Sequence, residues 1–257
     1  MREEKVKTVF HQRKPVIAMI HLNGEGKAQV QERAKREIEQ LYSCGADALL
    51  AENYFGSVDD VEWALDYLHT NYPEHIYGVN LLGDYETGFV LAENYGGKII
   101  QIDSVCGHLP VGPDANNITQ DGGFEKHLRR LRSRYPIFLM GGVRFKYQPV
   151  RSGRSAKEDL LLGKERCDAV VVTGAKTAVK TDMAKILSFR EILGDSPLFV
   201  GAGMTADNCR EQLSVADGAI VGSWFKVDGV TGNPVDPERV RMFMDVVREI
   251  RAEEENG

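Results

Sequence analysis

The sequence predicts an α/β protein with the (β/α)₈ TIM-barrel architecture, built as a single domain over residues 1–257. Two observations lead to this prediction. Eight short apolar runs alternate with helical patterns from end to end, and no linker or change in composition divides the chain. The length of 257 residues also fits, because barrels of this kind typically need about 250 residues.

The expected strands are apolar at consecutive positions instead of alternating with polar residues. Such runs are typical of a parallel sheet that is covered on both faces. In chain order they span residues 15–20, 47–52, 76–82, 98–103, 136–141, 168–173, 197–201 and 218–222. A doubly wound open sheet is the rival architecture, but the first turn, HLNGEGK at 21–27, lacks the G-x-G-x-x-G pattern expected of it.

Helix signals fill the segments between these runs. Ser57 opens an S-x-x-D cap ahead of a helical stripe, and Ser155 with Glu158 forms a capping box. Apolar residues at 124, 128, 131 and 135 predict another helix, because this spacing places them on one face.

The last helix carries the clearest signals. Asp236 is expected to cap it, Pro237 suits its first turn, and its buried stripe comprises Val240, Phe243, Met244, Val247 and Ile250. The acidic end of the chain, residues 252–257, is expected to be a short frayed tail.

Charge and composition exclude several classes of protein. The chain has 32 Lys and Arg against 38 Asp and Glu, a net charge of −6, whereas a nucleic-acid binder normally presents a basic face. No apolar stretch approaches the roughly 18–20 residues of a membrane span, so no membrane insertion is expected. Four widely spaced cysteines without a CxxC pair indicate reduced thiols and a cytoplasmic protein. A homo-oligomer remains open.

Glycines after the last two strands predict a phosphate site. Gly201 and Gly203 follow the seventh strand, and Gly222 with Ser223 follows the eighth. Barrels often bind phosphate at these two loops, where backbone N–H groups converge near a short helix N-terminus. Glycine lets an anion approach the backbone closely, although tight turns alone would also explain it.

A cationic loop after the fifth strand supports an anionic ligand. The segment GGVRFKYQPVRSGR at 141–154 carries Arg144, Lys146, Arg151 and Arg154 without a carboxylate. Arg144 and Lys146 lie closest to the strand and are expected to bind the ligand. Arg151 and Arg154 fit solvated loop charges equally well. Lys226, in the last loop, is a further candidate cation.

Carboxylates at strand ends are candidates for catalysis. Glu52 and Asp103 follow the second and fourth strands and could share acid/base chemistry. Together with Asn53 and Asn80 they could instead hold a divalent cation such as Mg²⁺, which prefers oxygen ligands. His21, after the first strand, is a candidate base or ligand, or a structural histidine. Asp114, Asn116 and Asn117, in the long loop at 104–123, are possible substrate contacts.

Several segments resemble the BtpA family of barrel proteins. They are KPVIAMIHL (14–22), GADALLAENYFG (45–56), DAVVVTGAKT (168–177), VGAGMTADN (200–208) and ADGAIVGSWFKVDGVTGNPVDPERV (216–240). The resemblance implies functional roles for His21, Glu52, Asn53, Asn80, Thr173, Gly174, Gly201, Gly203, Gly222 and Lys226. Ala178 departs from the pattern, because a second glycine is expected there after TG.

The favoured function is an enzyme that acts on a small phosphorylated metabolite, a sugar phosphate or nucleotide, through isomerase, lyase or phosphoribosyl-type chemistry. Its basis is the predicted anion site beside strand-end carboxylates. Two alternatives stay open: a non-catalytic biogenesis factor for a membrane complex, which the family's name suggests, and a regulator that binds the phosphorylated ligand without turnover. No residue pattern specifies an organic cofactor.

Overall fold

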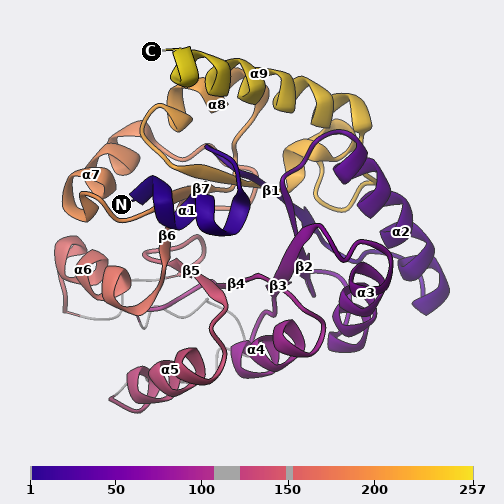
Figure 1. Cartoon of the computed structure of the whole chain (residues 1–257), viewed down its shortest axis with the longest axis horizontal. Helices are drawn as coiled ribbons and strands as arrows, with labels where there is room; N and C mark the ends of the chain where they lie inside the picture. The colour runs from indigo at the N-terminus through magenta and orange to yellow at the C-terminus, as the bar shows by residue number, and fades with distance from the viewer. Residues whose placement is uncertain (1, 107–121, 149–152, 257) are drawn as a thin grey trace.

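The computed structural model describes residues 2–106, 122–148 and 153–256. Within them, eight parallel strands close into a barrel in chain order, with β8 paired to β1 (Figure 1). The strands are β1 Val16–Ile20, β2 Ala48–Glu52, β3 Ile76–Asn80, β4 Ile99–Ile102, β5 Phe138–Gly142, β6 Ala169–Thr173, β7 Leu198–Gly201 and β8 Gly218–Val221. The predicted (β/α)₈ barrel is therefore confirmed.

A helix follows every strand and covers the outside of the barrel (Figure 1). Ser57 and Ser155 cap their helices, and each hydroxyl accepts a hydrogen bond from the backbone N–H three residues ahead. The helices are α2 Lys27–Ser43, α3 Val58–Asn71, α4 Tyr85–Asn94, α5 Gly122–Arg134, α6 Ala156–Arg166, α7 Met183–Leu193, α8 Ala206–Leu213 and α9 Pro237–Asn256, with short 3₁₀ turns η1 Ser223–Phe225 and η2 Val227–Gly229.

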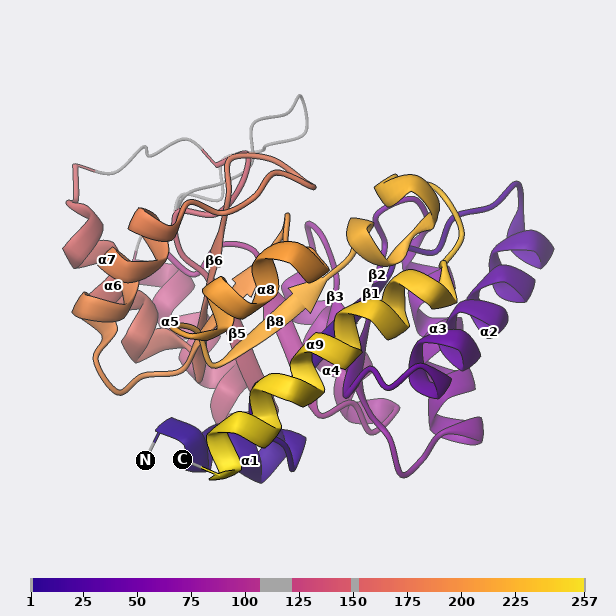
Figure 2. The ribbon, with the colours of Figure 1, turned by 90° about the horizontal axis from the view of Figure 1, so that it is seen from above.

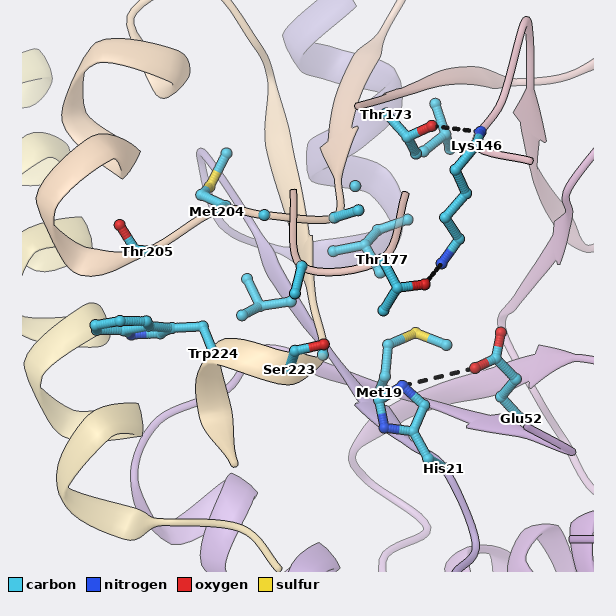
Figure 3. Close-up of a pocket in the computed structure, with 18 of the residues that line it drawn as sticks. Met19, His21, Glu52, Lys146, Thr173, Thr177, Met204, Thr205, Ser223 and Trp224 are labelled. Atoms are coloured by element: carbon cyan, nitrogen blue, oxygen red, sulfur yellow. Dashed lines mark hydrogen bonds and ion pairs between the residues drawn. The ribbon is translucent and has the colours of Figure 1, made fainter. Parts of the chain in front are cut away.

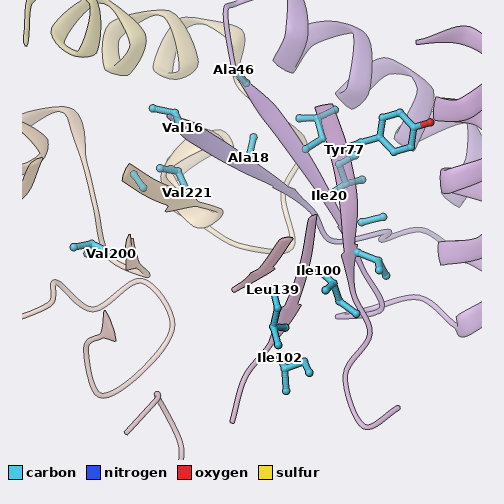
Figure 4. Packing of buried hydrophobic residues seen from close by; sticks show 14 of the residues in the cluster. Val16, Ala18, Ile20, Ala46, Tyr77, Ile100, Ile102, Leu139, Val200 and Val221 are labelled. Atoms are coloured by element: carbon cyan, nitrogen blue, oxygen red, sulfur yellow. The ribbon is translucent and has the colours of Figure 1, made fainter. Parts of the chain in front are cut away.

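Alternate residues of each strand serve two separate cores. One set, which includes Ile17, Leu50 and Phe199, fills the barrel interior. The other set, which includes Ala18, Ile100 and Val200, packs outward against the helices (Figure 4). Because successive side chains of a strand point to opposite faces, both faces of the sheet are buried. This burial explains why the strands read as continuous apolar runs.

Helix α1, Arg2–Phe10, has no counterpart among the expected elements. It lies across one end of the barrel (Figures 1 and 2). Val6 and Phe10 are buried there, and the Phe10 ring lies 5.8 Å from that of Phe138, the first residue of β5, and 5.9 Å from that of Phe199. Helix α1 therefore seals the amino-terminal end and leaves the carboxyl ends of the strands for function.

Residues 252–256, which were expected to belong to a short frayed tail, form the last part of α9, which continues to Asn256. Its acidic side chains have partners: Arg210 of α8 bonds Glu249 at 2.8 Å and Glu253 at 2.6 Å. The predicted stripe from Val240 to Ile250 is buried as expected. Among the described residues, no helix combines the length and hydropathy that crossing a membrane requires.

The core stripe of α9 provides a test of the packing. Phe243 is completely buried, with its ring 5.4 Å from that of Phe225, whereas the neighbouring Met242 is 51% exposed. Phe243→Ala is expected to lower the free energy of unfolding by about 3–5 kcal/mol, because it leaves a cavity. Met242→Ala should change it by no more than about 0.5 kcal/mol. Urea denaturation measures both, and equal effects would contradict this packing.

Candidate functional site

A pocket of about 120 Å³ opens at the carboxyl ends of the strands. Residues from both halves of the barrel line it (Figure 3). Its polar side chains are His21, Glu52, Gln101, Lys146, Thr173, Thr177, Thr205 and Ser223, and the backbone of Gly201–Thr205 and Gly222–Trp224 forms one wall. In a barrel this is the face where βα loops assemble functional sites.

Glu52, the last residue of β2, is buried in the pocket wall. The amide nitrogen of Asn80, at the end of the neighbouring β3, donates a hydrogen bond to its Oε1 at 2.8 Å. Burial raises the pKa of Glu52 to about 8, and the nearby Asp103 adds to the increase, while Lys146 and the bond from Asn80 oppose it. Glu52 therefore carries a proton at neutral pH.

His21 lies directly beside this carboxyl group. Its Nε2 is 3.6 Å from Oε2 of Glu52, the oxygen that Asn80 does not contact. Burial lowers the pKa of His21 well below 6.5, and the positive charges of Lys226 and Lys146 lower it further. The contact consequently joins two neutral groups. The Nδ1 atom has no hydrogen-bond partner among the described residues.

Asp103 faces the same cluster from the end of β4. Its Oδ1 accepts hydrogen bonds from Asn80 at 3.2 Å and from Gln101 at 2.8 Å. The amide nitrogen of Asn80 thus lies between the two carboxyl groups and donates a hydrogen bond to one oxygen of each. Within the described residues, no group of three or more His, Cys, Asp or Glu side chains is arranged for a metal ion. The arrangement suits tuning of the Glu52 proton better than a cation cage.

The glycine-bearing turns after β7 and β8 form the opposite wall. Gly201, Gly203, Gly222 and Ser223 all line the pocket. A Cβ on Gly222 would lie 2.9 Å from Cε1 of His21, so the imidazole occupies the space that this glycine leaves. The Ser223 hydroxyl lies 2.8 Å from that of Thr231.

Two glycines also allow close packing between loops. Gly203 has φ +69°, and a Cβ there would lie 2.2 Å from the backbone of Val179 in the β6–α7 loop. A Cβ on Gly174 would likewise lie 2.5 Å from the carbonyl oxygen of Val179, and Gly174, a predicted binding residue, is not among the residues that line the pocket. Ala178 lines the pocket with φ +61°, a left-handed conformation that explains the expectation of glycine at this position.

Three residues predicted to bind the ligand have hydrogen-bond or ion-pair partners within the protein. Arg144 pairs with the buried Asp159 at 2.9 Å, beside Arg154 at 2.8 Å. Asn53 bonds the backbone of Leu82, accepting from its N–H at 2.7 Å. Neither Arg144 nor Asn53 is part of the pocket lining.

Lys226 is the third of these residues. It is completely buried, and its ammonium donates to Oε2 of Glu37 in α2 at 2.7 Å. Arg33 bonds the other oxygen of Glu37 at 2.8 Å and also the carbonyl of Gly232 at 3.0 Å. These buried charges fasten the segment after β8 to α2, so Lys226 is not available to a ligand.

Lys146 and Thr173, two of the predicted substrate-binding residues, line the pocket. The backbone N–H of Lys146 donates to Oγ1 of Thr173 at 2.8 Å, and its Nζ lies 3.4 Å from Oγ1 of Thr177 (Figure 3). Gln101 and Thr177 are pocket residues that the sequence analysis missed. A polar residue inside the apolar run KIIQID was the available signal for Gln101. Arg151, Asp114, Asn116 and Asn117 lie outside the described residues.

Comparison with known proteins identifies a matching protein family and relatives that are similar in sequence over most of the chain. A model described as the BtpA family matches residues 73–249. An uncharacterized protein of Thermococcus kodakarensis is 32% identical over 265 residues, covering 93% of this chain and 97% of the relative. The photosystem I biogenesis protein BtpA of Synechocystis is 24% identical over 267 residues, covering 93% and 90%.

Solved structures share the architecture at low sequence identity. Phosphoribosyl anthranilate isomerase from Thermus thermophilus aligns with a TM-score of 0.60 at 11% identity, covering 92% of this chain and all of that one. Thiamine phosphate pyrophosphorylase from Pyrococcus furiosus gives a TM-score of 0.60 at 14% identity, covering 92% and 96%. At these identities the likeness shows the fold alone.

Burial of Glu52 predicts a pH dependence of stability. The carboxyl ionises near 4.5 in the unfolded chain but near 8 in the folded protein, so unfolding releases a proton between these pH values. Stability is therefore retained below about pH 4.5 and lost as pH rises towards 8, by about 1.4 kcal/mol per pH unit. Glu52→Gln has no carboxyl group to ionise at this position and lacks this loss. The free energy of unfolding of Glu52→Gln, relative to that of wild type, should therefore increase across the same pH range.

Urea denaturation from pH 5 to pH 8.5 measures the difference. Glu39→Gln is the matched control, because Glu39 is exposed and its substitution should leave the wild-type pH dependence unchanged. Parallel stability curves for wild type and Glu52→Gln would show that the Glu52 carboxyl is as well solvated when folded as when unfolded.

Proposed function

The chain belongs to the BtpA family, and from the geometry of its pocket we propose that it is an enzyme acting on a small phosphorylated metabolite by acid/base chemistry. One observation carries the proposal. A single pocket holds the Glu52–His21 pair on one side and the glycine turns after β7 and β8 on the other. A ligand anchored at the turns would present its reactive carbon atoms to the pair.

Four observations support phosphate at the turns. The residues from Gly201 to Thr205 lead directly into the N-terminus of α8, whose first N–H groups have no partner within the helix. The turn after β8 lines the same pocket, and its Ser223 hydroxyl faces the pocket interior (Figure 3). Phosphate binding at these two loops recurs among barrels. The names of two structural neighbours also include phosphorylated compounds, which is support by fold analogy.

The acid/base pair is matched to opposite tasks. Glu52 keeps its proton up to about pH 8 and can donate it to a carbonyl or leaving-group oxygen. His21 is neutral over the same range and can accept a proton from carbon or oxygen. Environments that push two pKa values apart in this way are typical of acid and base partners. Asp103 contributes by keeping Glu52 protonated. The favoured reaction classes are isomerisation and lyase chemistry.

The binding half of the proposal can be tested at Ser223. Ser223→Asp would place a carboxylate beside the expected phosphate and should weaken binding of inorganic phosphate at least about 100-fold, because like charges at close range cost several kcal/mol. Ser223→Asn has nearly the same shape without the charge and should retain most of the affinity. Gly203 is unsuitable for this test, since any side chain there would strike the backbone of Val179.

Calorimetric titration of both variants and wild type gives the affinities, and thermal unfolding verifies that both variants fold. Equal phosphate affinity in the aspartate and asparagine variants would show that phosphate does not bind at these turns. A wild-type protein that binds neither inorganic phosphate nor any phosphorylated metabolite would favour the biogenesis-factor alternative that the Synechocystis relative's name suggests.

The catalytic half requires a substrate, which mass spectrometry of ligands retained by gently purified protein can identify. With that substrate, Glu52→Gln should lower turnover by about 10²–10⁴-fold, the usual effect of losing one proton donor. Wild-type turnover should fall as pH rises through about 8, where Glu52 loses its proton. Turnover by Glu52→Gln at the wild-type rate would exclude Glu52 as the acid.

A further inference from the structure

We infer that the ligand of this pocket is a phosphorylated carboxylic acid, whose carboxylate binds between the Lys146 ammonium and the Thr177 hydroxyl. This inference rests on the proposed phosphate site and adds a second anionic group to the ligand. It begins from the distribution of charge. Lys146 is the only Lys or Arg among the residues that line the described pocket, and no carboxylate of the described residues pairs with it.

The position of Lys146 is set by its loop. Its backbone N–H is held by Thr173 at 2.8 Å, and its stem passes beside Phe145, with Nζ 5.7 Å from the ring centre. Thr177 is held in turn, because its N–H donates to the hydroxyl of Tyr147 at 3.0 Å. Two neighbouring loops therefore bring an ammonium and a hydroxyl 3.4 Å apart at the pocket surface. Both groups can donate hydrogen bonds to the oxygens of one carboxylate.

Among the described residues, no neighbouring negative charge compensates the Lys146 ammonium. Arg144, in the same loop as Lys146, and Lys226, after β8, are each paired with a buried carboxylate, Asp159 and Glu37 respectively. Among the residues that line the described pocket, Glu52 alone carries a carboxyl group. It does not supply a negative charge at neutral pH, because burial raises its pKa to about 8. A half-buried cation without a carboxylate partner favours an anionic ligand, and the described residues supply no such partner here.

The second subsite is separate from the phosphate turns. Lys146 and Thr177 come from the loops after β5 and β6, whereas the turns follow β7 and β8. Figure 3 shows Lys146 entering from the side of Glu52, with Ser223 and Trp224 across the pocket. A ligand that reaches both subsites must lie past His21 and Glu52. The carbon next to its carboxylate would then face the acid/base pair.

Matched ligands isolate the carboxylate. 3-Phosphoglycerate and glycerol 3-phosphate differ only in whether a carboxylate or a hydroxymethyl group ends the chain, and phosphoglycolate with 2-hydroxyethyl phosphate forms a shorter pair. The wild-type protein should bind the acid of at least one pair about tenfold or more tightly than its alcohol, the usual worth of a charge-assisted hydrogen bond. Calorimetry in buffer of low ionic strength measures all four, because salt screens exposed charges.

Variants assign the preference to a residue. Lys146→Met keeps the length of the side chain without its charge, and should bind acid and alcohol equally while retaining the wild-type affinity for inorganic phosphate. Lys176→Met removes an exposed lysine from the β6–α7 loop and should preserve the preference. Lys146→Arg keeps the charge and should retain part of the preference.

Each remaining outcome has a defined meaning. Equal affinities for acid and alcohol in both pairs would overturn the inference while leaving phosphate binding intact. Loss of inorganic phosphate binding in Lys146→Met would also overturn it, because Lys146 would then belong to the phosphate site. A wild-type protein that binds no inorganic phosphate would instead refute the proposed function on which the inference rests.

Discussion

The pairing of β8 with β1 is the interaction on which the candidate site depends. The ladder that aligns Val16 with Ala219 and Ala18 with Val221 closes the barrel. It brings His21, one residue past β1, against Gly222, one residue past β8, so that a Cβ on the glycine would lie 2.9 Å from the imidazole. The Glu52–His21 pair at the ends of the first two strands and the glycine turns of the last two thereby share one pocket. An open sheet with the same residues at its strand ends would separate them.

Closure also determines the electrostatics of the site. Sealed below by the packed interior, Glu52 and His21 have little water to stabilise a charge, and burial is the largest cause of the shift in both pKa values. It raises one and lowers the other, so both groups are neutral together at physiological pH. Lys146 differs because it is only half-buried and keeps contact with solvent. The described pocket thus combines the neutral Glu52–His21 pair with one half-buried cation, a combination suited to an anionic ligand.

Much of the fold could be predicted because the relevant signals are local. Consecutive apolar residues marked each strand to within two residues of its observed ends, and strand-end position correctly placed Glu52, His21 and the glycine turns at one face. Partners distant in the sequence could not be predicted. Lys226 looked like an anion ligand because nothing near it reveals Glu37, 189 residues away. Gly174 was predicted to bind the ligand because the sequence does not show how its loop packs. In the folded loop, the carbonyl of Val179 occupies the space that a Cβ on Gly174 would need. Helix α1 was not predicted because its segment is mostly charged. Its two buried side chains, Val6 and Phe10, form too short an apolar pattern to indicate a helix.

The central claim is that an anion bound at the β7 and β8 turns lies in the same pocket as the Glu52–His21 pair. A crystal structure of the wild-type protein grown with inorganic phosphate tests it most directly. The account predicts a phosphate held by the backbone N–H groups of Gly201–Thr205 and Gly222–Trp224, within reach of the Ser223 hydroxyl, with His21 and Glu52 facing it across the pocket. Empty turns at saturating phosphate, or an anion bound only at another surface of the molecule, would contradict it.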